Sequence, residues 1–367
     1  MVRKHIDKTF LWIILLLSGV GFIIFTSASL GLLARSNSEL FTSVAGKQLF
    51  LGLGLGLVVL FFVSRIKYTF WRKHAFYIFI FSIFLTLMVF IPGIGLSHNG
   101  ATRWIDLRFI SFQPSELLKY GFIIYMAAWY SNKKKDVKSF SFGLVPFVVV
   151  SAIVGLVLVA QPDTDTLVVM LAGAAAIYFA AGAPWKHILL LALVGAVGLA
   201  GIIFTQPYIK QRLTTFLDPS QNGLTSGYQI QQSLIAIGSG QVGGRGFGQS
   251  VQKFSYLPEP VGDSIFAVAA EEFGFIGSSL LLLLFIFFAT RGLKIASKST
   301  DAFGRYVTIG IITMITVQAC MNIAAMLAII PLSGQTFPFV SHGGTALMIT
   351  LAAMGIILNV SKFQGKT

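Results

Sequence analysis

Ten stretches of this chain are apolar over the length that a helix needs to cross a lipid bilayer. A crossing helix takes about 20 mostly apolar residues. Within the bilayer, a helix satisfies its backbone hydrogen bonds by itself. The pattern therefore predicts an all-α polytopic membrane protein with ten transmembrane helices in one domain, residues 1–367. The predicted spans are approximately 10–34, 48–64, 75–95, 115–131, 141–160, 165–182, 187–205, 264–290, 306–330 and 340–361.

The charged residues are few and unevenly placed. Only 11% of the residues are charged, whereas a soluble domain has about 25%. Ten spans put both termini on one side, and that side carries eighteen of the 27 Lys and Arg residues. Because short cytoplasmic loops are enriched in basic residues, we expect both termini in the cytoplasm. The net charge of +14 is spread over short loops, which fits anionic lipid rather than nucleic acid.

Several classes of protein are disfavoured by what the sequence lacks. The single cysteine, Cys320, rules out a disulfide framework and a cysteine metal cluster. No glycine-rich loop ends in Gly-Lys-Ser/Thr, so nucleotide hydrolysis is not expected. The first apolar run is too long for the core of a cleavable signal peptide.

Two external segments are long enough to carry function. Residues 96–114 join the third and fourth spans, and residues 206–263 form a long extracytoplasmic loop between the seventh and eighth. In residues 227–237, aliphatic side chains at helical spacing predict a short amphipathic helix at the membrane interface. The glycine-rich residues 243–248 fit either a phosphate-binding loop or a flexible turn.

Polar residues gather at the start of the fourth span. They are Arg103, Gln113, Ser115, Glu116 and Lys119. Glu116 follows a proline in a first helical turn, where an acid stabilises the positive end of the helix dipole. Lys119 lies three residues further on, so the two can form an ion pair at the membrane edge. Such a pair is either structural or holds an anionic head group.

Two shorter polar stretches border other spans on the same face. Asp163 and Asp165 bracket a threonine between the fifth and sixth spans, as helix caps or as part of a cation site. Residues 337–345 open the last span and contain Ser341 and His342. The glycines that follow them suit close helix packing or the approach of a ligand.

Asp263 stands at the border between the long external loop and the eighth span. It is either the N-cap of that span or a reacting group, because a carboxylate at this border is costly to bury. Lys253 and Glu259 precede it closely. Glu271 and Glu272 lie roughly 12–13 Å deeper along the same helix. Acids at such a depth are expected to face the bundle interior and to pair.

Taken in this order, these stretches resemble the SEDS family of membrane proteins, named for shape, elongation, division and sporulation. The resemblance covers nearly all of the chain. The matching stretches are residues 100–105 (GATRWI), 112–117 (FQPSEL) with Lys119, 161–163 (QPD), 227–233 (GYQIQQS), 236–240 (AIGSG), 256–259 (YLPE), 263–268 (DSIFAV), 271–275 (EEFGF) and 338–341 (PFVS) with Gly343 and Gly344.

The resemblance implies ten transmembrane helices and peptidoglycan glycosyltransferase activity, in which lipid II is polymerised at the outer face of the bacterial cytoplasmic membrane. The essential aspartate of the family falls on Asp263, and Arg103, Glu116 and Lys119 match its other functional positions. The implied partners are lipid II, a class B penicillin-binding transpeptidase and other divisome membrane proteins. Residues 248–253 and 334–339 look more like the cell-division member, FtsW, than the elongation member, RodA.

The chain departs from the family pattern at three places. The family usually has Leu-Gly where this chain has Thr164 and Asp165, and Tyr where it has His342. It usually has His-Thr-Asp-Phe where residues 261–264 read Val-Gly-Asp-Ser. The last departure changes the immediate neighbours of Asp263.

The expected mechanism is an inverting glycosyl transfer with Asp263 as the general base on the acceptor hydroxyl. We expect cationic groups, or a divalent cation such as Mg or Mn, to stabilise the pyrophosphates. The cationic candidates are Arg103, Lys119, Arg212 and Lys253. The other candidates for substrate binding are Gln113, Ser115, Glu116, Glu259, Ser341 and His342.

Two alternatives remain from the sequence. A lipid II flippase would use Glu271 and Glu272 along a polar path through the membrane. A divisome scaffold would have no activity of its own. An enzyme should gather its polar residues on one face, and the motifs of this chain cluster outside.

Overall fold

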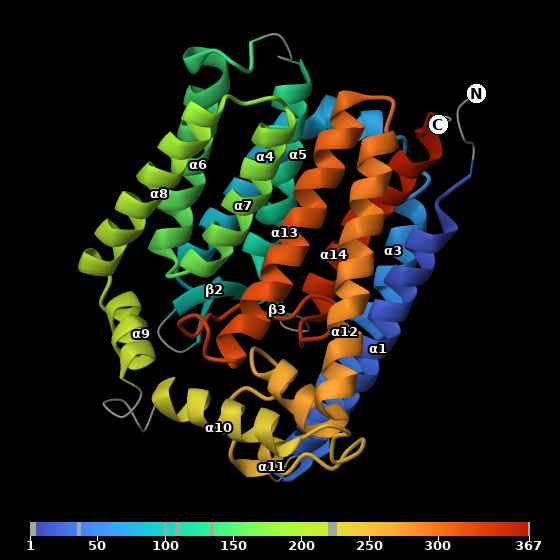
Figure 1. Ribbon diagram of the computed structural model, residues 1–367, viewed down its shortest axis with the longest axis vertical. Coiled ribbons are helices and arrows are strands. Elements are labelled where there is room, and N and C mark those ends of the chain that lie inside the picture. Colours follow the sequence, from blue (N-terminus) through green and yellow to red (C-terminus); the bar gives the residue numbers. More distant parts are fainter. Residues whose placement is uncertain are drawn as a thin grey trace.

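The computed structural model describes residues 5–34, 38–98, 101–106, 111–132, 136–218 and 226–365. Long helices lie side by side and run between two ends of the molecule (Figure 1). The bundle is formed by α1 (Lys8–Ala34), α2 (Ser38–Lys47), η1 (Gln48–Leu55), α3 (Gly56–Val63), α4 (Tyr68–Leu87), η2 (Met88–Phe90), α5 (Pro114–Asn132), η3 (Phe140–Leu144), α6 (Val145–Ala160), α7 (Thr164–Ala180), α8 (Trp185–Thr205), α12 (Ile265–Lys298), α13 (Ala302–Met326), α14 (Gly344–Val360) and η4 (Ser361–Phe363).

Among the described residues, eight helices are long and apolar enough to cross a membrane. α7 has 17 residues and falls short of this length, while α5 has 19 residues and carries the buried Glu116 and Lys119. Both pack inside the bundle, against each other and against α13. The polytopic helical fold is therefore confirmed, and the number ten stays a prediction.

Some helices begin or end away from the predicted positions. The span expected at 75–95 begins at Tyr68, because Asn359 of α14 accepts a hydrogen bond from the Tyr68 backbone N–H at 2.8 Å. This contact caps α4 from a distant part of the chain. The span expected at 264–290 continues to Lys298.

Small residues let the helices approach closely, as the sequence predicts. A methyl group at Gly56 would stand 2.7 Å from Leu351 Cδ1 on α14. At Gly173 it would stand 3.0 Å from the Gly310 carbonyl oxygen on α13. Side chains any larger would push these helix pairs apart, so the glycines fix the spacing of the bundle.

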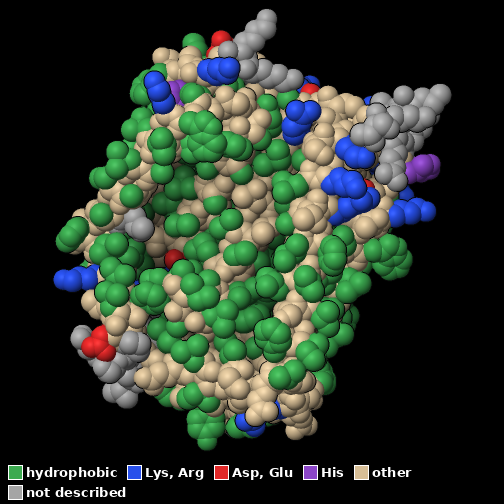
Figure 2. Space-filling model, viewed as in Figure 1, with side chains coloured by type: hydrophobic (Ala, Val, Ile, Leu, Met, Phe, Trp, Pro, Cys, Tyr) green, Lys and Arg blue, Asp and Glu red, His purple; other side chains and the backbone are tan. Residues whose placement is uncertain are grey.

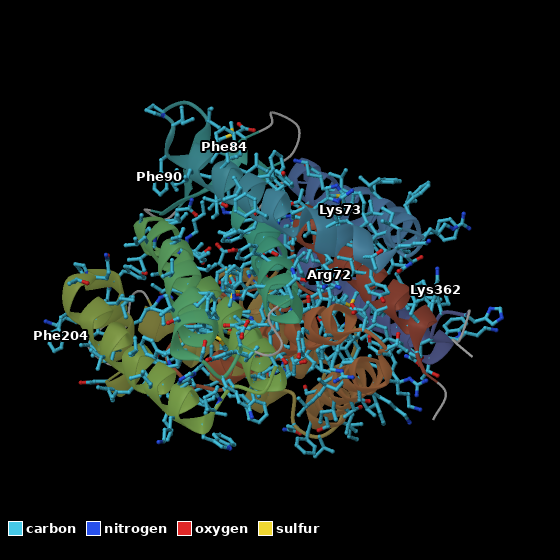
Figure 3. All side chains as sticks on the ribbon, turned by 90° about the horizontal axis from the view of Figure 1, so that it is seen from above. Arg72, Lys73, Phe84, Phe90, Phe204 and Lys362 are labelled. Carbon is cyan, nitrogen blue, oxygen red and sulfur yellow. The ribbon has the colours of Figure 1, made fainter. Side chains whose placement is uncertain are left out.

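Basic side chains gather at the end where α1 begins and η4 lies, whereas hydrophobic side chains are spread over the rest of the face that Figure 2 shows. Figure 3 looks down on this end, with Arg72, Lys73 and Lys362 over neighbouring helices. Arg291 pairs there with Asp7 at 2.8 Å. The basic end is the one that the sequence assigns to the cytoplasm.

The opposite end carries a small sheet that the all-α prediction omitted. β1 (Gly95–His98), β2 (Ala101–Asp106) and β3 (Ser111–Phe112) form an antiparallel sheet in the order β1-β2-β3. The strands have four, six and two residues. Strands this short show no clear alternation of apolar and polar residues, so periodicity does not reveal them.

The segment predicted as a long external loop contains three helices and lies at the same end (Figure 1). It contains α9 (Pro207–Leu217), α10 (Ser226–Ser239) and α11 (Gln252–Ser255). α10 confirms the amphipathic helix predicted at 227–237, and it packs against α12. Its buried stripe is Ile230, Ser233 and Ala236, while Leu234 and Ile235 are exposed. The apolar stripe predicted from the sequence was Ile230, Leu234 and Ile237, and of these three only Ile230 is buried.

Candidate active site

Asp263 lies on a tight turn directly before α12. The backbone N–H groups of Gly262 and Ser264 both donate to the Glu259 carbonyl, at 3.0 and 3.2 Å. Glu259 itself has a positive φ of 47°. Ser264, not Asp263, is the N-cap residue of α12. The carboxylate of Asp263 therefore does not cap α12 and is available for another role.

The segment before α14 holds this turn in place. The Ser341 hydroxyl donates to the Gly262 carbonyl at 2.7 Å, and the His342 backbone N–H donates to the Val261 carbonyl at 2.8 Å. The His342 ring stacks on Phe25. Burial lowers the pKa of this ring, so it is neutral at neutral pH. Ser341 and His342 thus lie at the site as predicted, but they position the backbone and supply no positive charge.

A buried asparagine clamps the same turn from α13. The Asn322 side-chain amide donates to the carbonyls of Asp263 and Gln335, both at 2.8 Å. The Gln335 amide in turn donates to the Thr166 hydroxyl at 3.0 Å. Asn322 therefore ties together the two segments that surround Asp263.

An ion pair stands beside Asp263. Arg212 Nη1 of α9 lies 2.8 Å from Asp165 Oδ2 of α7, and the Gly334 backbone N–H donates to the same oxygen at 2.8 Å. A methyl group at Gly334 would stand 3.5 Å from Arg212 Nη2, 3.7 Å from Asp263 Oδ2 and 3.8 Å from Asp165 Oδ2. One guanidinium and two carboxylates thus converge on a single point.

This environment changes the acidity of Asp263. Burial is the largest cause that raises the pKa of the Asp263 carboxyl, from its usual 3.8 to about 7. The negative charges of Glu259 and Asp165 raise this pKa further, and Arg212 and Arg103 lower it. A carboxyl with a pKa near neutrality suits a general base.

Arg103 of β2 lies close by and is held by the connection between α6 and α7. Its guanidinium donates to the Gln161 carbonyl at 3.1 Å and lies 3.9 Å from Asp163 Oδ1. The Ser115 hydroxyl donates to the other oxygen of Asp163 at 3.1 Å, and Gln113 donates to Ser115 at 3.0 Å. Three predicted site residues therefore meet around Asp163.

The predicted i,i+3 pair on α5 is confirmed. Lys119 Nζ lies 2.9 Å from Glu116 Oε1, and both side chains are buried. Lys119 also donates to Gln318 Oε1 of α13 at 3.0 Å. Gln318 donates to the Thr336 carbonyl at 3.0 Å, which links the pair to the segment around Gly334.

Lys253 lies in a different cluster. Its ammonium is fully buried, 2.5 Å from Glu272 Oε1 and 3.0 Å from the Ser27 hydroxyl of α1. Glu272 thus forms an ion pair with Lys253, and pairing was predicted for an acid at this depth. Lys253 joins α1, α11 and α12 here, and its charge is neutralised by Glu272.

The glycine-rich loop and the residues after it bind groups of the chain itself. Within the loop, the backbone N–H groups of Arg245 and Gly246 donate to the carbonyls of Glu271 and Glu272, at 3.0 and 2.9 Å. The backbone N–H groups of Val251 and Gln252 donate to the Glu271 carboxylate at 3.0 and 3.3 Å. Arg245 lies 3.4 Å from the same carboxylate. The loop also fits against a kink in α12 at Gly274, which has a φ of 63°. The loop is thus neither a free turn nor an open phosphate site.

Several polar residues of the site were not among the predicted site residues. Asp163 and Asp165 were interpreted as helix caps or cation ligands, and Gln318 and Asn322 were not singled out. Gln318 and Asn322 lie four residues apart, on one face of an otherwise apolar span. Polar residues within a span usually face the bundle interior, so this spacing was a signal that could have found them.

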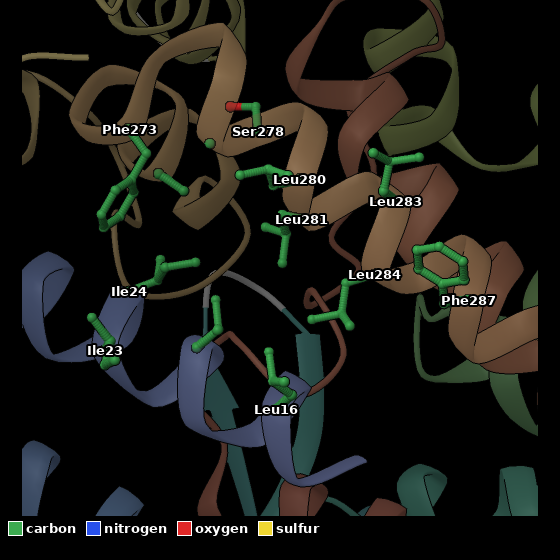
Figure 4. A pocket seen from close by; sticks show the side chains of 13 residues that line it. Leu16, Ile23, Ile24, Phe273, Ser278, Leu280, Leu281, Leu283, Leu284 and Phe287 are labelled. Carbon is green, nitrogen blue, oxygen red and sulfur yellow. The ribbon is translucent and has the colours of Figure 1, made fainter. Parts of the chain in front are cut away.

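A separate cavity of about 510 Å³ lies between α1 and α12 (Figure 4). Its lining is apolar and includes Leu16, Ile24, Leu281 and Phe287. It offers no group for acid–base chemistry and is distinct from the Asp263 cluster.

The part of the chain that the structure describes contains no group of three or more His, Cys, Asp and Glu residues arranged to hold a metal ion. The carboxylates of Asp165 and Asp263 do not make a complete protein cation site by themselves. We therefore assign no chemical step to a divalent cation.

Comparisons with known proteins agree with this architecture. Residues 8–366 match the family model described as "Cell cycle protein", which covers FtsW, RodA and SpoVE. Stage V sporulation protein E of Bacillus subtilis is 40% identical over 358 residues, or 98% of this chain and 97% of the relative. A protein named probable peptidoglycan glycosyltransferase FtsW, from Geobacter sp., is 36% identical over 360 residues, or 97% and 96% of the two chains.

Two solved structures share the fold. One is a chain described under "Structural coordination of polymerization and crosslinking by a peptidoglycan synthase complex", with a TM-score of 0.80 and 25% identity over 98% of this chain and 99% of that one. The other is the rod shape determining protein RodA of Thermus thermophilus, with a TM-score of 0.72 and 25% identity over 99% and 98%. By its sequence over nearly its whole length, the chain belongs to the FtsW, RodA and SpoVE family of membrane proteins, the SEDS family.

Proposed function

We propose that this protein is a peptidoglycan glycosyltransferase that polymerises lipid II at the outer face of the bacterial cytoplasmic membrane during cell division or elongation. The observation that carries the proposal is the half-buried Asp263, whose pKa is raised to about 7 and which faces the Asp165–Arg212 pair. Several family members of similar length are named probable peptidoglycan glycosyltransferase FtsW.

The proposed reaction uses Asp263 as the general base. The ionised carboxylate takes the proton of the acceptor 4-hydroxyl as the oxygen attacks the anomeric carbon of the donor sugar. The bond from that carbon to the pyrophosphate oxygen breaks, and the lipid pyrophosphate leaves with the bonding electrons. Attack opposite the leaving group inverts the configuration. A positioned base of this kind contributes about 10²–10⁴-fold in rate.

The leaving pyrophosphate needs positive charge close to Asp263. Arg212 is the best candidate, because its guanidinium is partly exposed and lies beside the same point as the Asp263 carboxylate. Arg103 is a second candidate, also with a partly exposed side chain. Lys119 is a weaker one, since Glu116 and Gln318 already bind its ammonium. Lys253 is not included, because it is buried against Glu272.

A requirement for Mg or Mn stays part of the proposal. Mg²⁺ often binds through one or two carboxylates together with substrate phosphates, so a complete protein site is not needed. Polymerisation assays with and without a chelator test this requirement directly.

The proposed partners follow from the family. A class B penicillin-binding transpeptidase would cross-link the new strands, and a related chain has been solved in a peptidoglycan synthase complex. Other divisome membrane proteins are further partners. We place both termini in the cytoplasm, at the basic end of the bundle.

The test is lipid II polymerisation by purified wild-type protein and by Asp263→Asn, which keeps the size of the side chain but cannot accept the proton. We expect the wild type to form glycan strands and the variant to lose at least about 100-fold in rate. Polymer formation by Asp263→Asn at the wild-type rate would refute the assignment of the base.

The flippase alternative needs a polar path through the bundle. Glu271 and Glu272, the acids expected to line it, instead bind the loop before α11 and Lys253. This arrangement favours the enzyme. Movement of lipid II across vesicles by wild type and Asp263→Asn alike, without polymer formation, would favour the flippase; no activity of either kind would favour the scaffold.

A further inference from the structure

Two consecutive residues at the start of α7 both contact α9. The Tyr208 hydroxyl donates to Thr164 Oγ1 at 3.2 Å, and Arg212 Nη1 donates to Asp165 Oδ2 at 2.8 Å. Tyr208 and Arg212 lie four residues apart and therefore on one face of α9. These contacts form a polar link, which we call the α7–α9 latch. The leucine and glycine that the family pattern has at 164 and 165 offer no side-chain partner for it.

The latch matters because α9 is otherwise held mainly by its neighbours in the sequence. α9 packs against α8 and α10. α8 lies at the edge of the bundle (Figure 1). In the part of the chain that the structure describes, no residue of its apolar, membrane-length stretch is buried inside the protein. Its residue Phe204 stands at the outer edge in Figure 3. The latch thus helps to hold Arg212 beside Asp263.

The latch also places the negatively charged carboxylate of Asp165 where the diphosphate of the substrate must bind. Asp165 Oδ2 accepts hydrogen bonds from both Arg212 and the Gly334 backbone N–H. Arg212 Nη2, Asp165 Oδ2 and Asp263 Oδ2 all lie within 4 Å of one point at Gly334. In this state Asp165 neutralises the guanidinium that is best placed to bind a diphosphate.

Resting on the proposed function, we propose that Asp165 is an internal competitor of the substrate for Arg212. In the free protein its carboxylate holds the guanidinium, and with it α9, next to Asp263. When a lipid-linked diphosphate binds, the guanidinium transfers to the phosphate oxygens and the latch opens. Arginine binds phosphate through two parallel hydrogen bonds, which are stronger than a partly exposed ion pair.

Asp165→Asn separates this role from a structural one. Asparagine has the same shape, and its Oδ1 can still accept the hydrogen bond from the Gly334 N–H. It carries no negative charge, so it competes less well for Arg212. Since a partly exposed ion pair contributes little, we expect the affinity for the diphosphate lipid to rise about two- to fivefold.

The experiment measures binding of lipid II and of undecaprenyl pyrophosphate to the purified protein in detergent. All variants carry Asp263→Asn, so that no substrate is consumed. Asp165→Asn should bind both ligands more tightly than its parent. In a background that also carries Arg212→Gln, Asp165→Asn should no longer tighten binding, because the guanidinium for which Asp165 and the diphosphate compete is absent.

Asp7→Asn is the matched control, because Asp7 pairs with Arg291 at the same distance of 2.8 Å at the other end of the bundle. It should leave the affinity unchanged. Thermal unfolding of each variant verifies that it is folded. The proposal is overturned if Asp165→Asn binds with equal or lower affinity, if the gain persists with Arg212→Gln, or if neither ligand binds. Failure of the proposed function is a separate result, since it is read from polymerisation by the protein with Asp263 intact.

Discussion

The raised pKa of Asp263 predicts how polymerisation depends on pH. The base works only when it is ionised, and burial together with Glu259 and Asp165 brings its pKa to about 7. At pH 8 about 90% of the carboxyl is ionised, and at pH 6 about 10%. Lowering the pH from 8 to 6 should therefore reduce the rate about tenfold. A carboxyl at its usual pKa of 3.8 would lose almost nothing over this range.

The assay is the initial rate of glycan strand formation at lipid II concentrations well below saturation, where the pH dependence reports the pKa of the free protein, measured in one mixed buffer from pH 5 to 9. The variant Arg212→Gln tests whether the pKa of Asp263 sets the midpoint of the pH–rate profile. Because Arg212 lowers the pKa of Asp263, its loss should move the midpoint to higher pH as well as slow the reaction. Arg291→Gln is the matched control, since Arg291 has the same exposure and pair distance but contacts Asp7. It should leave the midpoint in place.

Thermal unfolding over the same pH range separates loss of the fold from loss of the base. A rate that is constant between pH 6 and 8, in protein that remains folded, would refute the reasoning. So would a midpoint that Arg212→Gln leaves unchanged or moves to lower pH.

Two further predictions concern stability. Asp263 has a higher pKa in the folded state than its usual 3.8, so the folded state is stabilised relative to the unfolded state below pH 4 and loses that advantage as the pH rises towards 7. Asp263→Asn never ionises and should match the wild type near pH 4 but unfold at a higher temperature at pH 8; a lower melting temperature at pH 8 would contradict this. Lys253→Met leaves Glu272 buried without its cation, and should lower the free energy of unfolding by about 3–5 kcal/mol in a denaturant titration. The double variant Lys253→Met/Glu272→Gln should recover part of the loss, and equal stability of the single variant and the wild type would show that the pair is not structural.

Local features of this protein were predictable because they depend on neighbours in the sequence. The apolar runs predicted the helices, since a backbone in lipid must satisfy its own hydrogen bonds. The proline and glutamate at residues 114–116 marked the start of α5, and the spacing of Glu116 and Lys119 predicted their ion pair. The order of the motifs also pointed to the family that the comparisons confirm.

The identity of the cation beside Asp263 was not predictable in the same way. Lys253 is only ten residues from Asp263, yet it pairs with Glu272 and Ser27. Arg212 is 51 residues before Asp263 in the sequence, yet it lies beside Asp263 because side chains of α9 contact the first residues of α7. Distance in the sequence was therefore a poor guide to distance in the site.

The sequence by itself determined a polytopic helical membrane protein, its family, and Asp263 as the residue of interest. The tertiary structure decided which charges surround Asp263, and it made Asp165 a partner of Arg212 rather than a simple helix cap. The physical reason is that helix formation follows the local pattern of apolar residues. Contacts between helices depend on how distant surfaces pack, and the pKa of a buried carboxyl depends on those contacts.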